Sequence, residues 1–263
     1  VYPRRAAFAV ASPVLGDEVG LTNHTWRFSI RRTGEMLRLD TLNVVNDFTA
    51  VALSVRSLGS GDVVAVGGGA AVPGTPIAVI GPGTGLGVSA LVPVGETWVA
   101  LATEGGHVTM AARDEDEDAV ISWLRRRHRG HVSAERVLSG PGLSNLYDAL
   151  AAVQGRQVES LPPSEITRRG LAGECDLCRA SLDMFFGMLG TVVGNLVLSL
   201  GARGGVYIAG GILPRIKDAF VASRFRERFE GKGRFMDYLG PVPVWLVTHP
   251  YPAFLGLEGL VRG

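Results

Sequence analysis

The chain carries an apolar run that leads into a loop with glycine at every second position. Residues 77–80 read I-A-V-I, and the glycines that follow are Gly81, Gly83, Gly85 and Gly87. Glycine adopts backbone angles closed to other residues and lets another group approach the main chain closely. Such a turn exposes several N–H groups, and Thr84 adds a hydroxyl. The pattern predicts either a phosphate-binding loop or no more than a tight turn.

The residues around this loop argue against two better-known nucleotide loops. A Walker A loop requires a Lys-Ser/Thr pair, and this stretch contains no lysine. The dinucleotide-binding pattern fits only loosely, as Gly85-x-Gly87-x-x-Ala90, and should open a helix. Residues 91–100 instead have the pattern of a strand, a turn and a strand. We therefore expect a glycine-rich hairpin. A hairpin of this kind that binds a nucleotide phosphate is typical of the sugar kinase, hexokinase and actin group.

Composition indicates a globular protein without a marked charge. The chain has 263 residues, 46% hydrophobic and 19% charged, enough for one large domain or two smaller ones. The net charge is +1, so we expect neither a nucleic acid nor a membrane as a partner. The apolar segment 182–200 includes Asp183 and Asn195, which are costly at bilayer depth. We interpret this segment as a buried helix.

The two cysteines, Cys175 and Cys178, form a C-x-x-C pair. A single pair cannot make a four-cysteine zinc site, and no suitably spaced histidine accompanies it. Nothing around it resembles a thioredoxin unit, so we expect structural thiols. Scarce cysteine and the lack of a signal peptide predict a cytoplasmic protein.

Helical and strand patterns alternate along the chain, which predicts the α/β class. Acidic residues begin the segment 114–129 and basic residues end it, so these charges are expected to stabilise a helix. Ser164 is expected to cap a helix after Pro162-Pro163. The expected strands are 6–10, 42–45, 77–80, 91–94, 97–100, 205–209 and 243–248, and the other expected helices are 33–39, 47–58, 143–153, 174–200, one from about Pro214, and 253–261.

Asn46 and Asp47 follow an apolar strand, at the position where open α/β sheets bind ligands. The Asp47 carboxylate could accept a proton from a reacting hydroxyl, as a general base does, and Asn46 could orient that hydroxyl. The alternative is that the pair only caps a helix.

Glu104 and His107 form an E-x-x-H pattern, which binds metal when it lies on a helix. The two glycines between them argue against a helix, so we expect no metal here. In a turned segment the acid and the imidazole could bind adjacent hydroxyls, or they could be ordinary loop residues.

Glu135 is by default a solvated acid. A sugar pocket needs such groups to converge, and the chain offers Asn46, Asp47, Glu104, His107 and Glu135.

Six ordered stretches make the chain resemble the bacterial-type glucokinases. They are L-T-N-H-T-W at 21–26, V-N-D-F-T-A at 45–50, the glycine loop at 81–87, E-G-G-H at 104–107, H-V-S-A-E-R-V-L-S-G-P-G at 131–142 and V-Y-I-A-G-G-I at 206–212. The resemblance covers nearly the whole chain. It implies a glycolytic enzyme that uses ATP and Mg²⁺ to phosphorylate the 6-hydroxyl of glucose, and a homodimer.

The resemblance also implies roles for particular residues. Asp47 would be the catalytic base. The nucleotide phosphates would face Gly83, Thr84 and Gly85, and the adenosine would lie by Gly210 and Gly211. The zinc-binding cysteine cluster of the repressor-related sugar kinases is missing, which favours the other glucokinase branch. The residues implied to bind the sugar are Asn46, Asp47, Glu104, His107, Glu135 and, as a weaker candidate, Asn23.

The fold implied by the resemblance is the two-lobed, actin-like ATPase (ribonuclease H-like) fold of sugar kinases. The small lobe would comprise residues 1–57 and 248–263, and the large lobe residues 58–247. The D-x-G-G-T phosphate turn with which the family begins does not occur in this sequence. We therefore expect a small lobe truncated at its N-terminus, in a fragment of a longer protein. The alternatives are a truncated, non-catalytic sugar-binding module and a kinase for another hexose.

Overall fold

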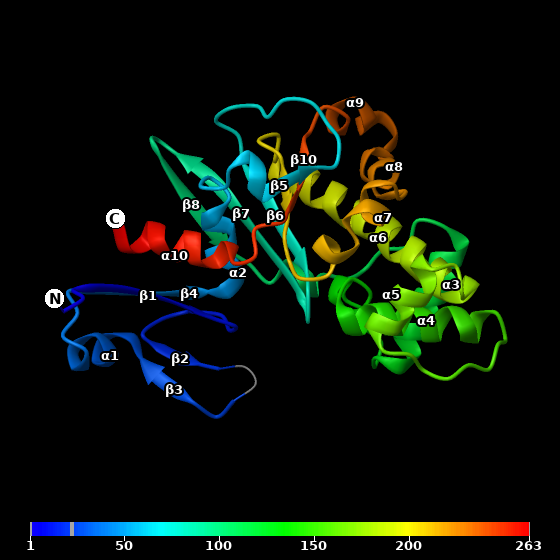
Figure 1. The fold of residues 1–263 in the computed structure, drawn as a ribbon, viewed down its shortest axis with the longest axis horizontal. Helices are drawn as coiled ribbons and strands as arrows, with labels where there is room; N and C mark the ends of the chain where they lie inside the picture. The colour runs from blue at the N-terminus through cyan, green and yellow to red at the C-terminus, as the bar shows by residue number, and fades with distance from the viewer. Residues whose placement is uncertain (1, 22–23, 263) are drawn as a thin grey trace. The chain divides into compact units, whose positions relative to one another are not determined.

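The computed structural model describes residues 2–21 and 24–262, and its architecture is α/β (Figure 1). A six-stranded sheet has the order β5-β10-β9-β6-β7-β8. Strand β9 pairs in parallel with both β6 and β10, and β7 pairs antiparallel with β8. The strands are β5 (Val63–Ala65), β6 (Ile77–Pro82), β7 (Leu86–Val94), β8 (Thr97–Ala102), β9 (Val206–Ile208) and β10 (Val244–Val247).

The chain divides into two compact units. The first comprises residues 1–64, 89–103 and 247–263, and the second comprises residues 65–88 and 104–246. The segment 89–103, which the sequence-based lobes assigned to the large lobe, groups with the first unit. The lobe boundaries themselves stay a prediction.

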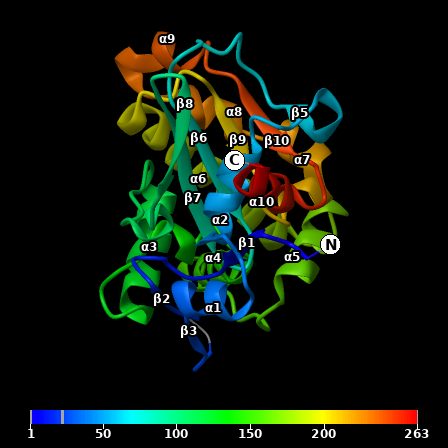
Figure 2. The same ribbon diagram turned by 90° about the vertical axis from the view of Figure 1, so that its left-hand side faces the viewer.

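Besides its strands of the six-stranded sheet, the described residues of the first unit form two small strand pairs and three α-helices. Strand β1 (Arg5–Val10) pairs in parallel with β4 (Thr41–Asn46), and β2 (Glu18–Gly20) pairs antiparallel with β3 (Arg27–Ser29). The helices are α1 (Ile30–Met36), α2 (Asp47–Ser54) and α10 (Pro252–Arg262). Helix α10 lies beside α2 and β1 (Figures 1 and 2). A Cβ on Gly256 would lie 1.9 Å from the Ala50 carbonyl oxygen, so glycine permits this close packing.

Two helices of the first unit differ from their predicted ranges. Helix α1 begins three residues earlier than expected, because the Ser29 hydroxyl accepts a hydrogen bond from the Arg32 N–H and caps the first turn. Helix α2 ends at Ser54, four residues short of the predicted end, and turns rather than helix follow it.

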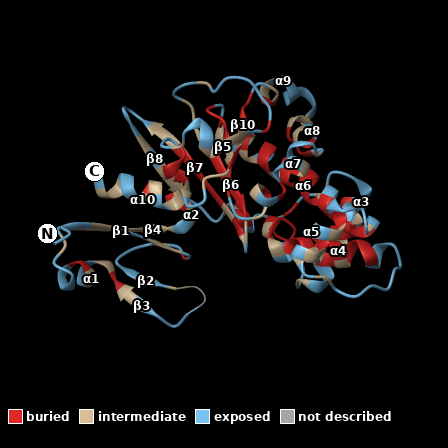
Figure 3. Ribbon diagram, viewed as in Figure 1, coloured by how far each residue is buried: buried red, intermediate tan, exposed pale blue. Residues whose placement is uncertain are grey.

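The second unit contains seven helices among its described residues. Figure 3 shows that burial is concentrated on β6, β7, α4 and α6. The helices are α3 (Glu115–Arg127), α4 (Gly140–Val153), α5 (Pro163–Leu171), α6 (Asp176–Leu200), α7 (Lys217–Val221), α8 (Phe225–Glu230) and α9 (Met236–Leu239).

The predicted cap of α5 is wrong. The helix follows Pro162, and Pro163 occupies its first position, where the N–H that proline lacks would have no helical partner. Ser164 therefore lies inside the first turn. The helix expected from about Pro214 begins as a 3₁₀ turn, Leu213–Ile216, before α7.

Helix α6 is long and apolar enough to cross a membrane by length and composition alone, but 67% of its most apolar window is buried inside the protein. Helices α4, α5 and α8 pack against it. A Cβ on Gly190 would lie 2.3 Å from the Phe225 carbonyl oxygen, and one on Gly194 would lie 2.6 Å from that of Phe229. The small residues let α8 approach the α6 backbone, as expected of a core helix.

Candidate active site

The glycine loop forms a tight hairpin between the neighbouring strands β6 and β7, as predicted. Gly83 donates its N–H to the Gly85 carbonyl oxygen at 2.8 Å. Its own carbonyl oxygen accepts the N–H of Gly140, the first residue of α4, also at 2.8 Å. Thr84 lies between Gly83 and Gly85, and its side chain is exposed. The hairpin therefore presents a hydroxyl on a fixed backbone.

The second glycine pair lies against this hairpin. Strands β6 and β9 are parallel neighbours, so their carboxyl ends meet at one edge of the sheet. Gly210 has φ of +94°, and a Cβ there would lie 2.3 Å from the Pro82 carbonyl oxygen. A Cβ on Gly211 would meet no atom within 4 Å. The structure thus brings the five predicted nucleotide residues to one edge: Gly83, Thr84, Gly85, Gly210 and Gly211.

Three of the predicted sugar residues form a cluster in the second unit. The Nε2 atom of His107 lies 3.8 Å from Glu104 Oε2, and its Nδ1 atom lies 4.0 Å from Glu135 Oε1. Both distances are too long for a direct hydrogen bond. The side chains of Glu104 and His107 are each 59% exposed, and that of Glu135 is 31% exposed. The cluster therefore offers acceptors and an imidazole to an external hydroxyl-rich ligand.

The Glu104–His107 segment is held against β7 by its glycines. Gly105–His107 forms one 3₁₀ turn, not the α-helix that an E-x-x-H metal site uses. A Cβ on Gly106 would lie 2.0 Å from the Leu86 carbonyl oxygen, so the turn packs on the strand backbone. Residues 2–21 and 24–262 contain no group of three or more His, Cys, Asp or Glu side chains placed to hold a metal ion.

Glu135 is bonded to the hairpin rather than free in solvent. Its Oε2 atom accepts the N–H of Leu86 at 2.9 Å. Its carbonyl oxygen accepts the hydroxyl of Ser139, which also caps α4 by accepting the Gly142 N–H at 3.0 Å. The Leu86 N–H and Ser139 are parts of the site that the sequence reasoning missed. The S-G-P-G motif was the available signal for Ser139, because serine is a preferred cap before a proline-containing first turn.

Asn46 and Asp47 lie side by side in the first unit. Asn46 caps α2, with Oδ1 accepting the N–H groups of Phe48 at 2.9 Å and Thr49 at 3.2 Å. The capping alternative is therefore what the structure shows for Asn46. Asp47 is exposed, and its Oδ1 atom accepts the Phe48 N–H at 2.8 Å. Asn23 lies outside the described residues.

The two cysteines begin α6 and are both free thiols. Cys175 caps the helix, and its Sγ accepts the Cys178 N–H at 3.2 Å. Burial opposes ionisation of Cys175, but hydrogen bonds from Cys178 and from the Leu177 backbone lower the pKa of its thiol. Burial and the neighbouring Cys175 raise the pKa of Cys178 to about 12. The raised pKa of Cys178 is typical of a structural thiol, whereas the structural role of Cys175 stays a prediction.

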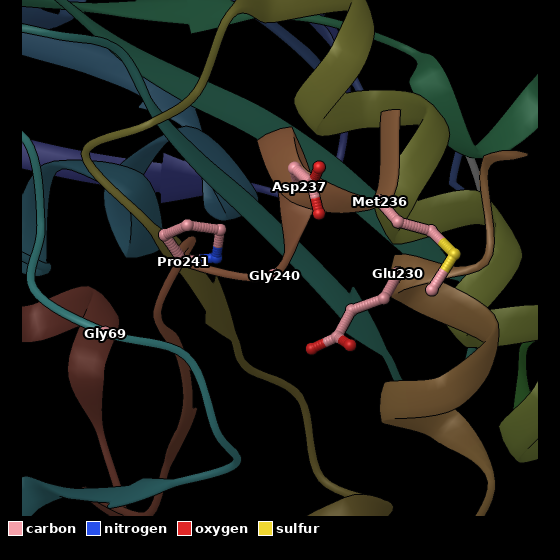
Figure 4. A pocket seen from close by; sticks show the side chains of 6 residues that line it. All are labelled: Gly69, Glu230, Met236, Asp237, Gly240 and Pro241. Carbon is pink, nitrogen blue, oxygen red and sulfur yellow. The ribbon is translucent and has the colours of Figure 1, made fainter. Parts of the chain in front are cut away.

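A separate recess in the second unit holds none of the predicted site residues. Figure 4 shows its lining side chains, including Glu230, Met236 and Asp237. Pro241, also in the lining, precedes β10, and β10 is parallel to β9. The recess therefore lies toward the amino ends of these strands, away from the edge that carries Gly210.

The family of this chain follows from its similarity to known proteins. A family model described as glucokinase matches residues 1–262. The chain belongs to the glucokinase family. The glucokinase of Paramagnetospirillum magneticum is 59% identical over 262 residues, an alignment that covers 99% of this chain and 81% of that protein. The chain therefore spans about four fifths of the length of this relative.

Solved glucokinase structures share the fold. The crystal structure of a glucokinase from an Antarctic psychrotroph matches 99% of this chain and 81% of its own, with a TM-score of 0.92 and 40% identity. A glucokinase structure from Balamuthia mandrillaris matches with a TM-score of 0.84 at 19% identity, covering 98% of this chain and 78% of its own. The predictions of the family, the fold and an ATP-using glucokinase are confirmed.

Proposed function

We propose that this glucokinase transfers the γ-phosphoryl group of ATP in line to the 6-hydroxyl of glucose. The family match over residues 1–262 carries the proposal. The second unit supports it, because a hairpin suited to phosphates is bonded through Glu135 to a cluster suited to hydroxyls. Phosphoryl transfer leaves little covalent work to the protein, so positioning and charge neutralisation dominate.

Glu104, His107 and Glu135 bind the sugar in this proposal, with Asn46, Asp47 and Asn23 contributing further bonds. Carboxylates accept hydroxyl protons, and an imidazole both accepts and donates, so this set suits an uncharged polyol. The Oδ1 atom of Asn46 is engaged in capping, so its amide nitrogen, now 3.4 Å from the Ser12 carbonyl oxygen, is the group left to meet a hydroxyl.

Asp47 is the proposed general base. Its Oδ1 atom is held by the Phe48 N–H, which fixes the carboxylate at the start of α2. The other carboxylate oxygen then takes the proton of the sugar hydroxyl late in the transfer. General-base assistance of this kind is worth roughly 10²–10⁴-fold in rate.

The nucleotide binds through Gly83, Thr84 and Gly85 at the phosphates and through Gly210 and Gly211 at the adenosine. The exposed Thr84 hydroxyl and the open space over Gly211 suit these roles. A magnesium ion brought in with the nucleotide would supply charge neutralisation at the phosphates that face Gly83, Thr84 and Gly85. We also propose a homodimer in the cytoplasm that serves glycolysis, as expected of the family.

A coupled kinase assay of the full-length protein with several sugars and phosphoryl donors tests this function. Turnover with glucose and ATP above that with other hexoses supports it. Higher turnover with another sugar identifies a different hexose kinase, and sugar binding without turnover identifies a non-catalytic module. Glu104→Gln and His107→Ala should mainly weaken glucose binding, measured by titration of intrinsic tryptophan fluorescence.

A further inference from the structure

The two oxygens of the Glu135 carboxylate face different parts of the second unit. Oε1 lies 4.0 Å from Nδ1 of His107, on the side of the proposed sugar ligands. Oε2 accepts the N–H of Leu86 at 2.9 Å, where the hairpin ends and β7 begins. Hydrogen bonds that involve an ionised group are the stronger ones in proteins. One side chain therefore supports both the hydroxyl-binding cluster and the end of the phosphate hairpin.

Glycine at position 85 makes this contact possible. A Cβ on Gly85 would lie 2.5 Å from Glu135 Oε2, a distance at which the carboxylate would have to move. Gly83, in the same hairpin, differs, because a Cβ there would meet only the Gly85 carbonyl oxygen at 4.0 Å. Neither glycine has a positive φ. A comparison of alanine at position 85 with alanine at position 83 therefore distinguishes displacement of the Glu135 carboxylate from a general effect of a side chain in the loop.

We propose that Glu135 is a positioning residue for the glycine hairpin as well as a sugar ligand, so that the shape of the hairpin and the affinity for glucose are coupled. The sugar half rests on the proposed function, whereas the hairpin half rests on the Leu86 bond alone. Coupling between two binding events is reciprocal, so a change in either part should be felt in the other.

The first test measures glucose affinity without nucleotide. Gly85→Ala should push the Glu135 carboxylate from its place and weaken glucose binding about tenfold or more, as the loss of a hydrogen bond to a charged group does. The matched control, Gly83→Ala, should leave glucose affinity within about twofold, because its methyl group enters open space. Equal glucose affinities in the two variants would overturn the coupling.

The second test measures binding of a non-hydrolysable ATP analogue with magnesium in the absence of sugar. Glu135→Ala should weaken this binding about tenfold, because the Leu86 N–H loses its acceptor. Glu135→Gln should restore it, since an amide oxygen can accept the same N–H, even though glucose binding stays impaired. The control is Glu159→Ala, at an exposed carboxylate with no part in the proposed site, which should bind the analogue as the wild type does.

Nucleotide affinity that is unchanged in Glu135→Ala, with a wild-type melting temperature, would overturn the positioning role. If the wild type failed to bind glucose, the proposed function would fail, and analogue binding would still decide the role of Glu135 in the hairpin. If Gly85→Ala did not fold, analogue binding by Glu135→Ala and Glu135→Gln would still decide whether Glu135 positions the hairpin.

Discussion

The guanidinium of Arg228 on α8 lies 2.6 Å from the carboxylate of Glu117 on α3, and only 1% and 2% of these side chains are exposed. Arg228 also donates to the Thr191 hydroxyl of α6 at 2.9 Å, and the second oxygen of Glu117 accepts the Arg113 N–H at 2.8 Å. One buried ion pair thus ties three helices of the second unit together.

Removal of either partner should destabilise the protein strongly. Arg228→Ala leaves the Glu117 carboxylate buried without its counter-ion, and such losses cost about 3–5 kcal/mol. The control is Arg262→Ala, which breaks the exposed pair with Glu258 and should change the free energy of unfolding by less than about 0.5 kcal/mol. Urea denaturation measures the free energy of unfolding of both variants. Similar decreases in Arg228→Ala and Arg262→Ala would contradict the importance of the buried ion pair.

Gly106 should be intolerant of any side chain. The methyl group of Gly106→Ala would lie 2.0 Å from the Leu86 carbonyl oxygen, so the Glu104–His107 turn must move off β7. Overpacking of this kind costs about 1–3 kcal/mol, and glucose affinity should fall with the displaced turn. Gly61→Ala is the control, since its methyl group meets nothing within 4 Å. Thermal unfolding and fluorescence titration report the two effects, and wild-type values for Gly106→Ala would refute the packing argument.

Asp47→Asn should reduce kcat by at least about a hundredfold while glucose still binds. The amide oxygen of asparagine can keep the hydrogen bond with the Phe48 N–H, so the start of α2 is preserved while the base is lost. Asp40→Asn changes an exposed carboxylate of the same unit, paired with Arg4, and should leave turnover near that of the wild type. A near-normal rate in Asp47→Asn, measured by the coupled assay, would remove Asp47 from the role of base.

His128, which follows α3, should make stability depend on pH. Burial, then the nearby Arg136 and Arg127, lower the pKa of this histidine below its ordinary value of 6.5. The unfolded chain therefore binds a proton first as the pH falls, so the free energy of unfolding should decrease below about pH 6.5. His128→Gln should make this decrease smaller.

The measurement is urea denaturation from about pH 7.5 to about pH 5. The matched variant His131→Gln alters an exposed histidine of the same segment. A decrease in stability that is the same in His128→Gln and in the wild type would assign the pH dependence to other groups.

Much of the fold followed from local patterns. The strands β1, β4, β6, β8, β9 and β10 formed within two residues of the predicted ranges, because short apolar runs specify them. Strand β7 begins at Leu86, five residues before the predicted start, since its first residues alternate with the glycines of the hairpin. The helices α3, α4 and α6 formed within a few residues of the predicted ranges, since their caps and charge order are encoded within the segments themselves. The wrong prediction of Ser164 as the cap of α5 also has a local origin. Serine signals a cap and proline signals a first helical residue, and at Pro163 and Ser164 the two signals conflict.

The amino-acid sequence by itself determined the α/β class, the glycine hairpin and the chemical kinds of group available to a sugar. It named Glu104, His107 and Glu135 without locating them, because contacts between residues far apart in the chain have no local signature. Only the tertiary structure decided that Glu135 reaches the N–H of Leu86, 49 positions away, and that glycine is needed at 85 to make room. Such a contact depends on where the 3₁₀ turn Ala134–Arg136 lies against the start of β7, and packing is a property of the folded chain rather than of any segment.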